Sequence, residues 1–417
     1  MLVEFKVGNF LSFKETVAFS MAAASIREHK DTHVFKAKNF QLLKSAVVYG
    51  ANASGKTNLI KAISFMRYFV INSSKESQAE EKINVDRFKL SSETDKKPSF
   101  FEITFIHENI RYRYGFEVDK EKVHSEWFFY TKERETMLFT REDNHFELGR
   151  AFRKEGKELE LKTRKNALFL SAAAQWNGEI SLKIVKWFTH HLKIIYGLNK
   201  GDISTTVDLL EKDNQLKDRV LEFIKVADLG IHEVKIEKSA KADLVSSSFV
   251  YTPEIRTFHK KYDDNGKTVS IEEFKMERDE SEGTKQLFSL IGLVINALNN
   301  GNLLIVDELD AQLHPLITNY IINLFNSTDK NPHNAQLIFN THDTNFLSNK
   351  LFRRDQIWFA EKDRQEATDL YSLVEYNFKV RKDESYGKNY IIGKYGAIPF
   401  LGYLDTYRVL GIKNSKQ

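Results

Sequence analysis

The sequence contains no cysteine and only 5 prolines among its 417 residues. Without cysteine the chain has no disulfide, no thiolate nucleophile and no cysteine-ligated zinc site, which fits a reducing compartment. The scarcity of proline argues against long disordered linkers. No apolar run approaches the length of a membrane-spanning helix, and the first residues alternate like a strand instead of forming the apolar core of a signal peptide. We therefore expect a soluble, cytoplasmic protein that has no membrane partner.

An excess of either charge is also missing, because 62 basic residues balance 58 acidic residues and leave a net charge of +4. A nearly neutral chain does not by itself indicate a nucleic-acid ligand, although local basic patches leave DNA binding open as an alternative. The basic residues considered for such a patch are Lys132, Arg134, Arg141, Arg164 and Lys165. The length is sufficient for two or three domain-sized units around a large core.

A phosphate-binding loop is the clearest feature that the sequence does contain. Residues 47–60 read as a buried strand, a glycine-flanked loop and the start of a helix, and they match the pattern G-x-x-x-x-G-K-[ST]. The loop N–H groups and the helix N-terminus are suited to bind phosphate oxygens. Lys56 is predicted to reach the β- and γ-phosphates, and the Thr57 hydroxyl to bind Mg²⁺. The residues predicted to bind ATP here are Gly50, Ala51, Asn52, Ala53, Ser54, Gly55, Lys56, Thr57 and Asn58.

The residues before this loop predict two strands within positions 1–20, joined by a turn at positions 9–13. Two interpretations of the turn stay open. Either Ser12 and Phe13 border the nucleotide base, or Phe13 is a core aromatic residue of a hairpin.

Three longer patterns follow the loop. Apolar residues alternate with a period near two from residue 99 to about 150, which predicts an antiparallel meander. Residues 180–226 read as helical throughout, and we interpret His190 and His191 as surface or packing residues because neighbouring residues of a helix point apart. Residues 232–275 return to strands with a turn at 263–266.

Two carboxylates follow a second strongly apolar strand. Residues 303–306 are four consecutive apolar residues, which is typical of a central parallel strand, and Asp307 and Glu308 come directly after them. Ligands of open α/β sheets bind at this end of the strands. Beside a phosphate loop, Asp307 reads as the Mg²⁺ partner and Glu308 as the base that polarises the attacking water.

A histidine follows a third apolar strand, at residues 336–340. A histidine at a strand end near the two other motifs is well placed to contact a γ-phosphate. His342 alone would more often be a structural histidine, and the order of the motifs along the chain favours the functional interpretation.

Taken together, these segments resemble the ABC-type ATPase head shared by the RecF, Rad50 and SMC proteins and the OLD-type ATPases. The matching segments are, in chain order, the turn at 9–13, Walker A at Gly50–Thr57, a shortened signature loop at Ser281–Thr284, Walker B with its catalytic glutamate at Ile305–Glu308, a D-loop at Leu309–Leu313, and the switch histidine His342.

The resemblance implies an α/β P-loop NTPase fold with a mixed central sheet, an antiparallel β-meander lobe and an inserted helical segment. It implies ATP and Mg²⁺ as cofactors. It further implies a head-to-tail dimer in which Ser281 and Gly283 of one copy complete the ATP site of the other. The family has a glutamine that helps to bind Mg²⁺, and Gln175 is the candidate for it in this sequence.

Shorter motifs resemble a narrower group, the stand-alone AAA15-type ATPases of bacterial phage-defence loci, which include AbiLi/RloA-like and PARIS-type proteins. These motifs are Leu313-His314-Pro315, Thr341-His342-Asp343 and residues 393–399. This resemblance implies the sensor or regulatory component of an abortive-infection system that controls a partner nuclease or toxin and responds to DNA or a phage protein. The alternative is a RecF-like repair ATPase that clamps DNA.

The expected organisation has four segments. An N-terminal ATPase lobe spans 1–175, a helical insertion 176–230, a C-terminal ATPase lobe 231–360 and a C-terminal extension 361–417. Only about 60 residues follow the last expected sheet strand, which is below the usual size of a domain. The Toprim nuclease that OLD-type proteins carry is therefore not expected here, and a nuclease activity is expected in a partner chain.

Overall fold

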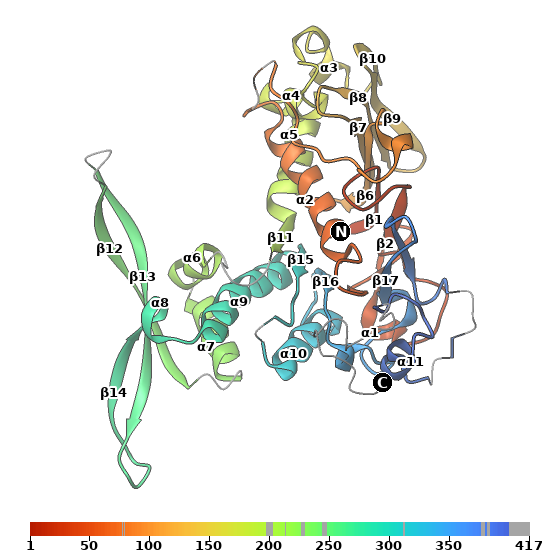
Figure 1. Ribbon diagram of the computed structural model, residues 1–417. Coiled ribbons are helices and arrows are strands. Elements are labelled where there is room, and N and C mark those ends of the chain that lie inside the picture. Colours follow the sequence, from red (N-terminus) through yellow and green to blue (C-terminus); the bar gives the residue numbers. More distant parts are fainter. Residues whose placement is uncertain are drawn as a thin grey trace, which may run out of the picture.

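Two large sheets, a projecting three-stranded arm and a small two-stranded sheet are the β-structure of the part of the chain that the computed structural model describes (Figure 1). The described residues are 1–76, 78, 80–196, 203–212, 214–226, 230–243, 248–311, 313–376, 380–381 and 384–399.

The first sheet is antiparallel and has the strand order β10-β9-β8-β7-β6-β1-β2. It combines the two N-terminal strands with the predicted meander, so both predictions are confirmed. Its strands are β1 (Leu2–Gly8), β2 (Val17–Ser20), β6 (Ser99–His107), β7 (Ile110–Val118), β8 (Val123–Thr131), β9 (Glu135–Glu142) and β10 (His145–Leu148).

The second sheet is mixed and has the strand order β11-β15-β16-β5-β17-β18. The first five strands are mutually parallel, and only the edge strand β18 is antiparallel to its neighbour. The apolar run at 303–306 lies in the buried strand β15, between two parallel neighbours, as predicted. The strands are β5 (Ser45–Tyr49), β11 (Leu192–Tyr196), β15 (Leu303–Asp307), β16 (Gln336–Asn340), β17 (Ile357–Lys362) and β18 (Thr368–Ser372).

Both faces of the mixed sheet are covered, which explains why its strands are continuously apolar. Successive side chains of a strand point to opposite faces, so Val48 packs into one core and Val47 into the other. The Val48 core also contains α2 (Lys56–Asn72), which lies between the two sheets, together with α4 (Phe169–Gln175) and α5 (Glu179–Lys186). The Val47 core contains α6 (Ser204–Lys212), α7 (Asn214–Val226), α9 (Glu282–Asn300), α10 (Pro315–Asn326) and α11 (Tyr386–Ile391).

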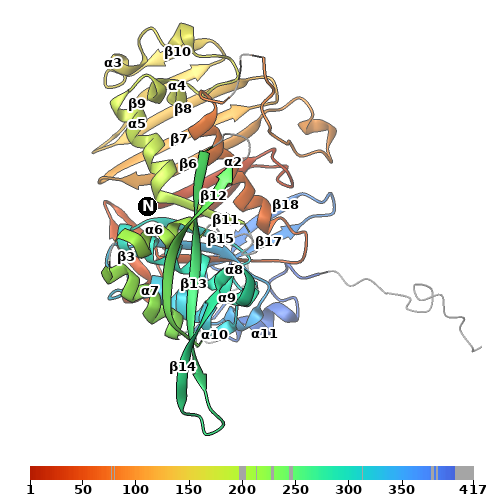
Figure 2. The ribbon, with the colours of Figure 1, turned by 90° about the vertical axis from the view of Figure 1, so that its left-hand side faces the viewer.

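The arm is a three-stranded antiparallel ribbon of β12 (Ile231–Asp243), β13 (Ser248–Tyr262) and β14 (Thr268–Lys275). Figure 2 faces the arm and shows β12 and β14 extending in opposite directions along the long strand β13. The predicted turn lies between β13 and β14, and its Asp263 carboxylate accepts hydrogen bonds from the backbone N–H groups of Asn265 (3.0 Å) and Lys267 (2.8 Å). The short helix α8 (Met276–Asp279) then leads from the arm to α9.

The remaining elements are short. They are α1 (Lys30–His33), β3 (Val34–Ala37), β4 (Phe40–Leu43), α3 (Arg153–Gly156), the π-helical turn Trp187–His191 and the 3₁₀ turns Ser92–Thr94, Glu160–Lys162, Thr344–Phe346 and Arg354–Gln356. Among the described residues, no helix combines the length and apolar character needed to cross a membrane.

Two expectations for the organisation need correction. Residues 180–226 are not helical throughout, because β11 (Leu192–Tyr196) pairs in parallel with β15 as a strand of the core sheet. The residues of β11 form a strand because they pair with β15. Local propensity alone does not reveal such a short strand inside a helical pattern. The last strand of the core sheet also lies later in the chain than expected. It is β18 (Thr368–Ser372), which belongs to the segment from residue 361 that was expected to follow the sheet. The division of the chain into four domains stays a prediction.

Candidate nucleotide-binding site

The order of the strands brings three of the predicted motifs to one edge of the mixed sheet. Strands β15, β16 and β5 are adjacent and parallel, so their C-terminal ends meet there. Asp307 is the last residue of β15, Asn340 is the last residue of β16, and Gly50 follows β5. Ligands of open α/β sheets bind at this kind of edge.

The glycines of the phosphate loop are required by close approaches of other chain segments. A Cβ atom at Gly50 would lie 2.3 Å from the Ala360 carbonyl oxygen, and one at Gly55 would lie 2.3 Å from the Thr368 hydroxyl oxygen. Gly55 also has a φ of +110°, which favours glycine, and it forms the N-cap of α2. The loop is therefore closely approached by residues of β17 and of the edge strand β18.

Lys56 is buried inside this loop. Its Nζ atom donates hydrogen bonds to the carbonyl oxygens of Gly50 (2.8 Å) and Ala51 (2.9 Å). Burial lowers the pKa of Lys56 to about 8, while the nearby carboxylates of Glu308, Asp307 and Asp310 act in the opposite direction. The ammonium group therefore faces the carboxylates at the same sheet edge.

The loop fits a phosphate group on two observations. The hydroxyl oxygen of Ser54 is buried and has no hydrogen-bond partner among the residues that the structure describes. Among the described residues, the Lys56 ammonium donates its hydrogen bonds to neutral carbonyl oxygens of the loop. A buried hydroxyl without a partner and a buried ammonium without a bonded carboxylate both gain from an anionic ligand. The polar groups of residues 50–57 thus match the triphosphate predicted from the sequence.

Thr57 and Asp307 come together as the magnesium assignment requires. The Thr57 hydroxyl donates a hydrogen bond of 3.0 Å to Asp307 Oδ1, across 250 residues of sequence. Hydroxyl and carboxylate oxygens are the donors that Mg²⁺ prefers. Asp307 is buried and Glu308 is exposed, so the two adjacent carboxylates lie in different environments. These residues can hold a magnesium ion that, when bound, neutralises phosphate charge.

The carboxylates that influence the pKa of Lys56 also influence the pKa of His342. Partial desolvation and the Lys56 ammonium lower the pKa of His342, and the carboxylates of Asp310, Glu308 and Asp307 oppose this shift. The side chain itself is exposed. His342 follows Thr341 directly after β16, at the same sheet edge, and its contact with a γ-phosphate stays a prediction.

The sequence analysis missed Thr368, which ties the C-terminal segment to the phosphate loop. The Thr368 hydroxyl donates to the Ser54 carbonyl oxygen (2.8 Å), and its oxygen can accept from the Ser12 hydroxyl, which lies 2.7 Å away. Ser12 also accepts a hydrogen bond of 2.8 Å from the Asn58 side chain, so the N-terminal turn adjoins the loop. Phe13 is fully buried in the core, which decides its interpretation in favour of a core aromatic residue. No local signal in the sequence points to Thr368.

The signature segment lies elsewhere. Ser281 caps α9, and its hydroxyl accepts a hydrogen bond of 3.1 Å from the Thr284 N–H group. In Figure 1 the end of α9 that carries Ser281 and Gly283 lies beside α8 at the base of the arm, well apart from α2. The structure therefore does not bring this segment to the phosphate loop of its own chain. Within the resembling D-loop, Gln312 lies outside the described residues.

The assignment of Gln175 as a metal ligand is wrong. Its side chain accepts a hydrogen bond of 2.5 Å from Ser74, which follows the C-terminal end of α2, whereas Thr57 lies at the N-terminal end. At a rise of about 1.5 Å per residue, the 17 residues of α2 separate these ends by about 25 Å. The Ala-rich run before Gln175 packs α4 into the core instead.

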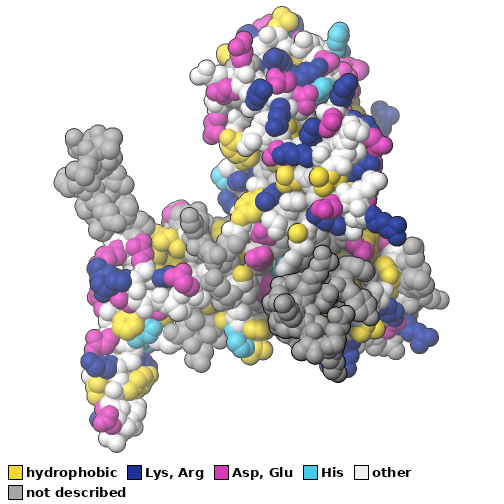
Figure 3. All heavy atoms as spheres, in the orientation of Figure 1, with side chains coloured by type: hydrophobic (Ala, Val, Ile, Leu, Met, Phe, Trp, Pro, Cys, Tyr) yellow, Lys and Arg dark blue, Asp and Glu magenta, His cyan; other side chains and the backbone are white. Residues whose placement is uncertain are grey.

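His191 and two of the five basic candidates, Arg141 and Arg164, have defined contacts in the fold. His191 Nδ1 lies 2.8 Å from Asn302 Oδ1, which agrees with a packing role, and no group of three or more His, Asp or Glu residues in the described chain is arranged to hold a metal. Arg141 is buried, and Arg164 donates to the Ser74 carbonyl oxygen (3.1 Å). Figure 3 shows basic and acidic side chains interspersed over the antiparallel lobe.

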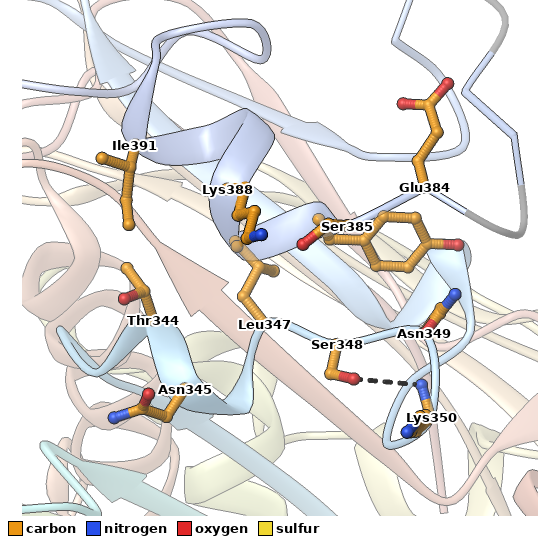
Figure 4. Close-up of a pocket in the computed structure, with 12 residues that line it drawn as sticks. Thr344, Asn345, Leu347, Ser348, Asn349, Lys350, Glu384, Ser385, Lys388 and Ile391 are labelled. Carbon is orange, nitrogen blue, oxygen red and sulfur yellow. Dashed lines mark hydrogen bonds between the residues drawn. The ribbon is translucent and has the colours of Figure 1, made fainter.

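A cavity of about 560 Å³ lies apart from this site, between the loop 344–350 and α11. Figure 4 shows its lining, with residues of the loop on one side and Ser385, Lys388 and Ile391 on the other. None of the predicted site residues lines this cavity.

The mixed sheet and its strand-edge motifs define a P-loop nucleotide-binding fold, to which the antiparallel lobe is joined. A family model described as "AAA domain, putative AbiEii toxin, Type IV TA system" matches residues 45–348, and the chain belongs to this family.

Comparisons with solved structures found distant similarity. The SMC head domain from Thermotoga maritima superposes with a TM-score of 0.40 and 11% identity, covering 89% of this chain and 98% of that chain. CbiO1 from Clostridium perfringens, part of the ABC transporter complex cbiONQ, gives a TM-score of 0.35 and 9% identity, covering 95% and 93%. A search of curated proteins found no match.

Proposed function

We propose that the chain binds ATP with Mg²⁺ at the edge formed by β15, β16 and β5, and hydrolyses it. Lys56 and the loop hold the phosphates, and Thr57 and Asp307 hold the metal. Glu308 accepts a proton from the attacking water, and His342 contacts the γ-phosphate. The observation that carries the proposal is the hydrogen bond of 3.0 Å between Thr57 and Asp307, directly beside the buried Lys56.

Replacement of Glu308 tests the catalytic assignment. Glu308→Gln keeps the size of the side chain but removes the base, so we expect ATP hydrolysis to fall by about 100-fold or more while ATP binding is retained. Glu142→Gln, at an exposed glutamate of the antiparallel lobe, is the matched control and should hydrolyse ATP at the wild-type rate. Unchanged turnover in Glu308→Gln would contradict the assignment.

The proposal includes a head-to-tail dimer, because the signature segment lies apart from the phosphate loop of its own chain (Figure 1). Ser281 and the N-terminus of α9 then supply hydrogen-bond donors and a positive helix end to the γ-phosphate of the partner copy. Such contacts exist only in the ATP-bound dimer, so ATP binding favours dimerisation and hydrolysis reverses it.

Mixing two inactive variants distinguishes this arrangement from a site within one chain. Lys56→Ala leaves its own loop unable to bind ATP but retains Ser281, whereas Ser281→Arg retains the loop and blocks the signature. In a head-to-tail dimer of the two variants, one of the two sites contains intact Lys56 and intact Ser281. We therefore expect activity to return on mixing. A mixture that stays inactive, although the two chains associate, would contradict the dimer.

The biological role that we propose is the sensor or regulatory component of an anti-phage, abortive-infection system. The description of the matching family, which names a putative AbiEii toxin and a type IV toxin–antitoxin system, supports this context. The described residues contain no group of three or more His, Asp or Glu residues arranged to hold a metal, so we place the nuclease or toxin activity in a partner chain. ATP-dependent dimer geometry would hold or release that partner when DNA or a phage protein acts as the trigger.

Co-purification from the native host with the products of neighbouring genes tests this role. A nuclease that stays bound to Glu308→Gln, which retains ATP, and dissociates from Lys56→Ala, which cannot bind it, or the reverse, would support regulation by nucleotide state. The RecF-like alternative predicts bound duplex DNA and a steep dependence of hydrolysis on salt. The contacts of Arg141 and Arg164 inside the fold weaken that alternative.

A further inference from the structure

Asn340 is a buried polar residue of the strand edge that no motif includes. It is the last residue of β16, and its exposed fraction is 1%. Its strand lies between β15, which ends in Asp307, and β5, which leads into the phosphate loop. Asn340 also precedes Thr341 and His342 in the chain, so it stands where three of the site's segments meet.

Both polar atoms of the Asn340 carboxamide form hydrogen bonds to residues at the end of the neighbouring strand β15. Its Nδ2 atom donates a hydrogen bond to Asp307 Oδ1, and its Oδ1 atom accepts one from the backbone N–H group of Glu308. A carboxylate oxygen can only accept here, and an N–H group can only donate, so a single orientation of the amide satisfies both partners. The side chain thus binds the two proposed catalytic carboxylate residues at once.

The backbone at Glu308 explains why this contact matters. Glu308 has a φ of +56°, in the left-handed region that a residue with a side chain rarely adopts. This turn in the chain separates the environments of the two carboxylates, because Asp307 is buried and the Glu308 side chain is exposed. The hydrogen bond from Glu308 N–H to Asn340 stabilises the turn.

The contact also selects which oxygen of Asp307 is available. Thr57 and Asn340 both donate to Asp307 Oδ1. Because both of these donors bond to Oδ1, Oδ2 is the oxygen that neither of them occupies and that can face a ligand. Partners that fix a ligating carboxylate in this way orient it and tune its affinity for metal.

We propose that Asn340 is a positioning residue of this site, which fixes the Asp307 carboxylate toward the metal and the Glu308 backbone toward the water. This inference rests on the proposed function, because it assigns roles toward the same magnesium and ATP. It predicts that metal affinity and turnover depend on the Asn340 amide, whereas binding of ATP to the loop does not.

Three variants test the proposal. Asn340→Ala removes both hydrogen bonds, Asn340→Ser keeps a smaller polar group, and Asn340→Asp places a carboxylate against Asp307. The matched control is Asn331→Ala, because Asn331 is also fully buried but bonds only to the backbone of Phe325 and Ala335. Its loss affects stability and leaves the strand edge intact.

The main readout is metal binding, measured by Mn²⁺ electron paramagnetic resonance with a non-hydrolysable ATP analogue. We expect Mn²⁺ affinity to fall by about 10- to 100-fold in Asn340→Ala and further in Asn340→Asp. The Mg²⁺ concentration for half-maximal hydrolysis should rise by a similar factor. Binding of a fluorescent ATP analogue in EDTA should stay within about twofold of wild type. Asn331→Ala should match wild type in all three measurements.

Wild-type Mn²⁺ affinity in Asn340→Ala would overturn the proposal, and so would a loss of metal affinity of equal size in Asn331→Ala. If Asn340→Ala does not fold, Asn340→Ser provides the same comparison with a smaller expected loss. A wild-type protein that binds Mn²⁺ and the ATP analogue but does not hydrolyse ATP would contradict the proposed function alone, since the metal measurement still tests Asn340.

Discussion

Buried charges occur both in the antiparallel lobe and at the edge of the mixed sheet, and they are satisfied in different ways. In the lobe, the buried Glu126 carboxylate accepts hydrogen bonds from Phe169 N (2.6 Å), Leu170 N (3.0 Å) and the Tyr114 hydroxyl (2.8 Å). Its neighbour Arg141 donates to the carbonyl oxygens of Ala167 (2.7 Å) and Asp143 (2.8 Å). This pair is completed by partners from its own chain.

At the sheet edge, the buried polar groups of the phosphate loop are not paired with charged partners among the described residues. Lys56 bonds only to carbonyl oxygens of its loop, and the buried Ser54 hydroxyl has no partner among the described residues. The lobe therefore uses buried charge to fix the fold, and the edge keeps buried polar groups for a ligand. Burial of a charged residue does not by itself indicate function, and the unpaired Ser54 hydroxyl points to a ligand because it belongs to the phosphate loop.

The largest expected difference between the two regions is the effect of removing the charge of Lys56 at the sheet edge or of Arg141 in the lobe. Lys56→Met removes the ammonium but preserves an unbranched side chain, so we expect ATP affinity to fall by about 100-fold or more. The free energy of unfolding should stay level or rise by about 1 kcal/mol, because a desolvated charge is removed. Calorimetric ATP titration and urea unfolding measure the two quantities. A marked loss of stability would show that Lys56, like Arg141, supports the fold.

Arg141→Met should have the opposite effect on stability. The substitution leaves Glu126 buried without its cation, and breaking a buried pair in this way costs about 3–5 kcal/mol of unfolding free energy. Urea unfolding of the variant measures the loss. ATP affinity per folded molecule should be unchanged, because Arg141 lies in the lobe and not at the strand edge. Lower affinity in the folded fraction would contradict this separation of roles.

Buried titratable side chains also make the stability of the fold depend on pH, and His33 is the example. Burial lowers the pKa of His33 to about 4, against the hydrogen bond with Gln356, which favours the charged form. The unfolded chain takes up a proton near pH 6.5, so stability falls as the pH drops from about 6.5 to 4, by about 3 kcal/mol for this group. His107 shifts in the same direction.

Unfolding free energies at pH 7 and pH 5 measure this effect. His33→Gln should reduce the pH dependence, and His145→Gln, at an exposed position, should leave it unchanged. Equal pH dependence in wild type and His33→Gln would show that His33 is not held neutral in the folded state.

The smallest expected effect concerns Ser54. Its hydroxyl has no partner to lose among the described residues, so Ser54→Ala should change the unfolding free energy by less than about 0.5 kcal/mol. ATP affinity should fall several-fold, by about 1 kcal/mol for one lost hydrogen bond. Calorimetric titration against wild type measures the loss. An unchanged affinity would place the phosphates away from this hydroxyl.

Several parts of the fold were predictable because their signals are local. The alternation in 99–150 produced the meander, and the apolar runs at 303–306 and 336–340 became parallel strands. Two parts were not predictable from local patterns. The strand β11 lies within a helical pattern, and β18 joins the sheet only through its pairing with β17.

The site shows the same division. The sequence pattern indicated Lys56, Thr57, Asp307, Glu308 and His342, because each belongs to a short motif of known chemistry. Thr368 and Asn340 were missed, since each is an ordinary polar residue whose partners are more than 30 positions away in the chain. Gln175 was assigned from a family resemblance alone, and the structure places it at the end of α2 opposite to Thr57.

The sequence by itself determined the local elements of this protein: the glycine-flanked loop, the apolar strands and the helix that Ser281 caps. Only the tertiary structure decided that β16 lies between β15 and β5, and hence that Asp307 meets Thr57 across 250 residues. The physical reason is that backbone conformation follows from neighbouring residues, whereas strand order follows from burying both faces of one sheet. Such pairing depends on the whole chain.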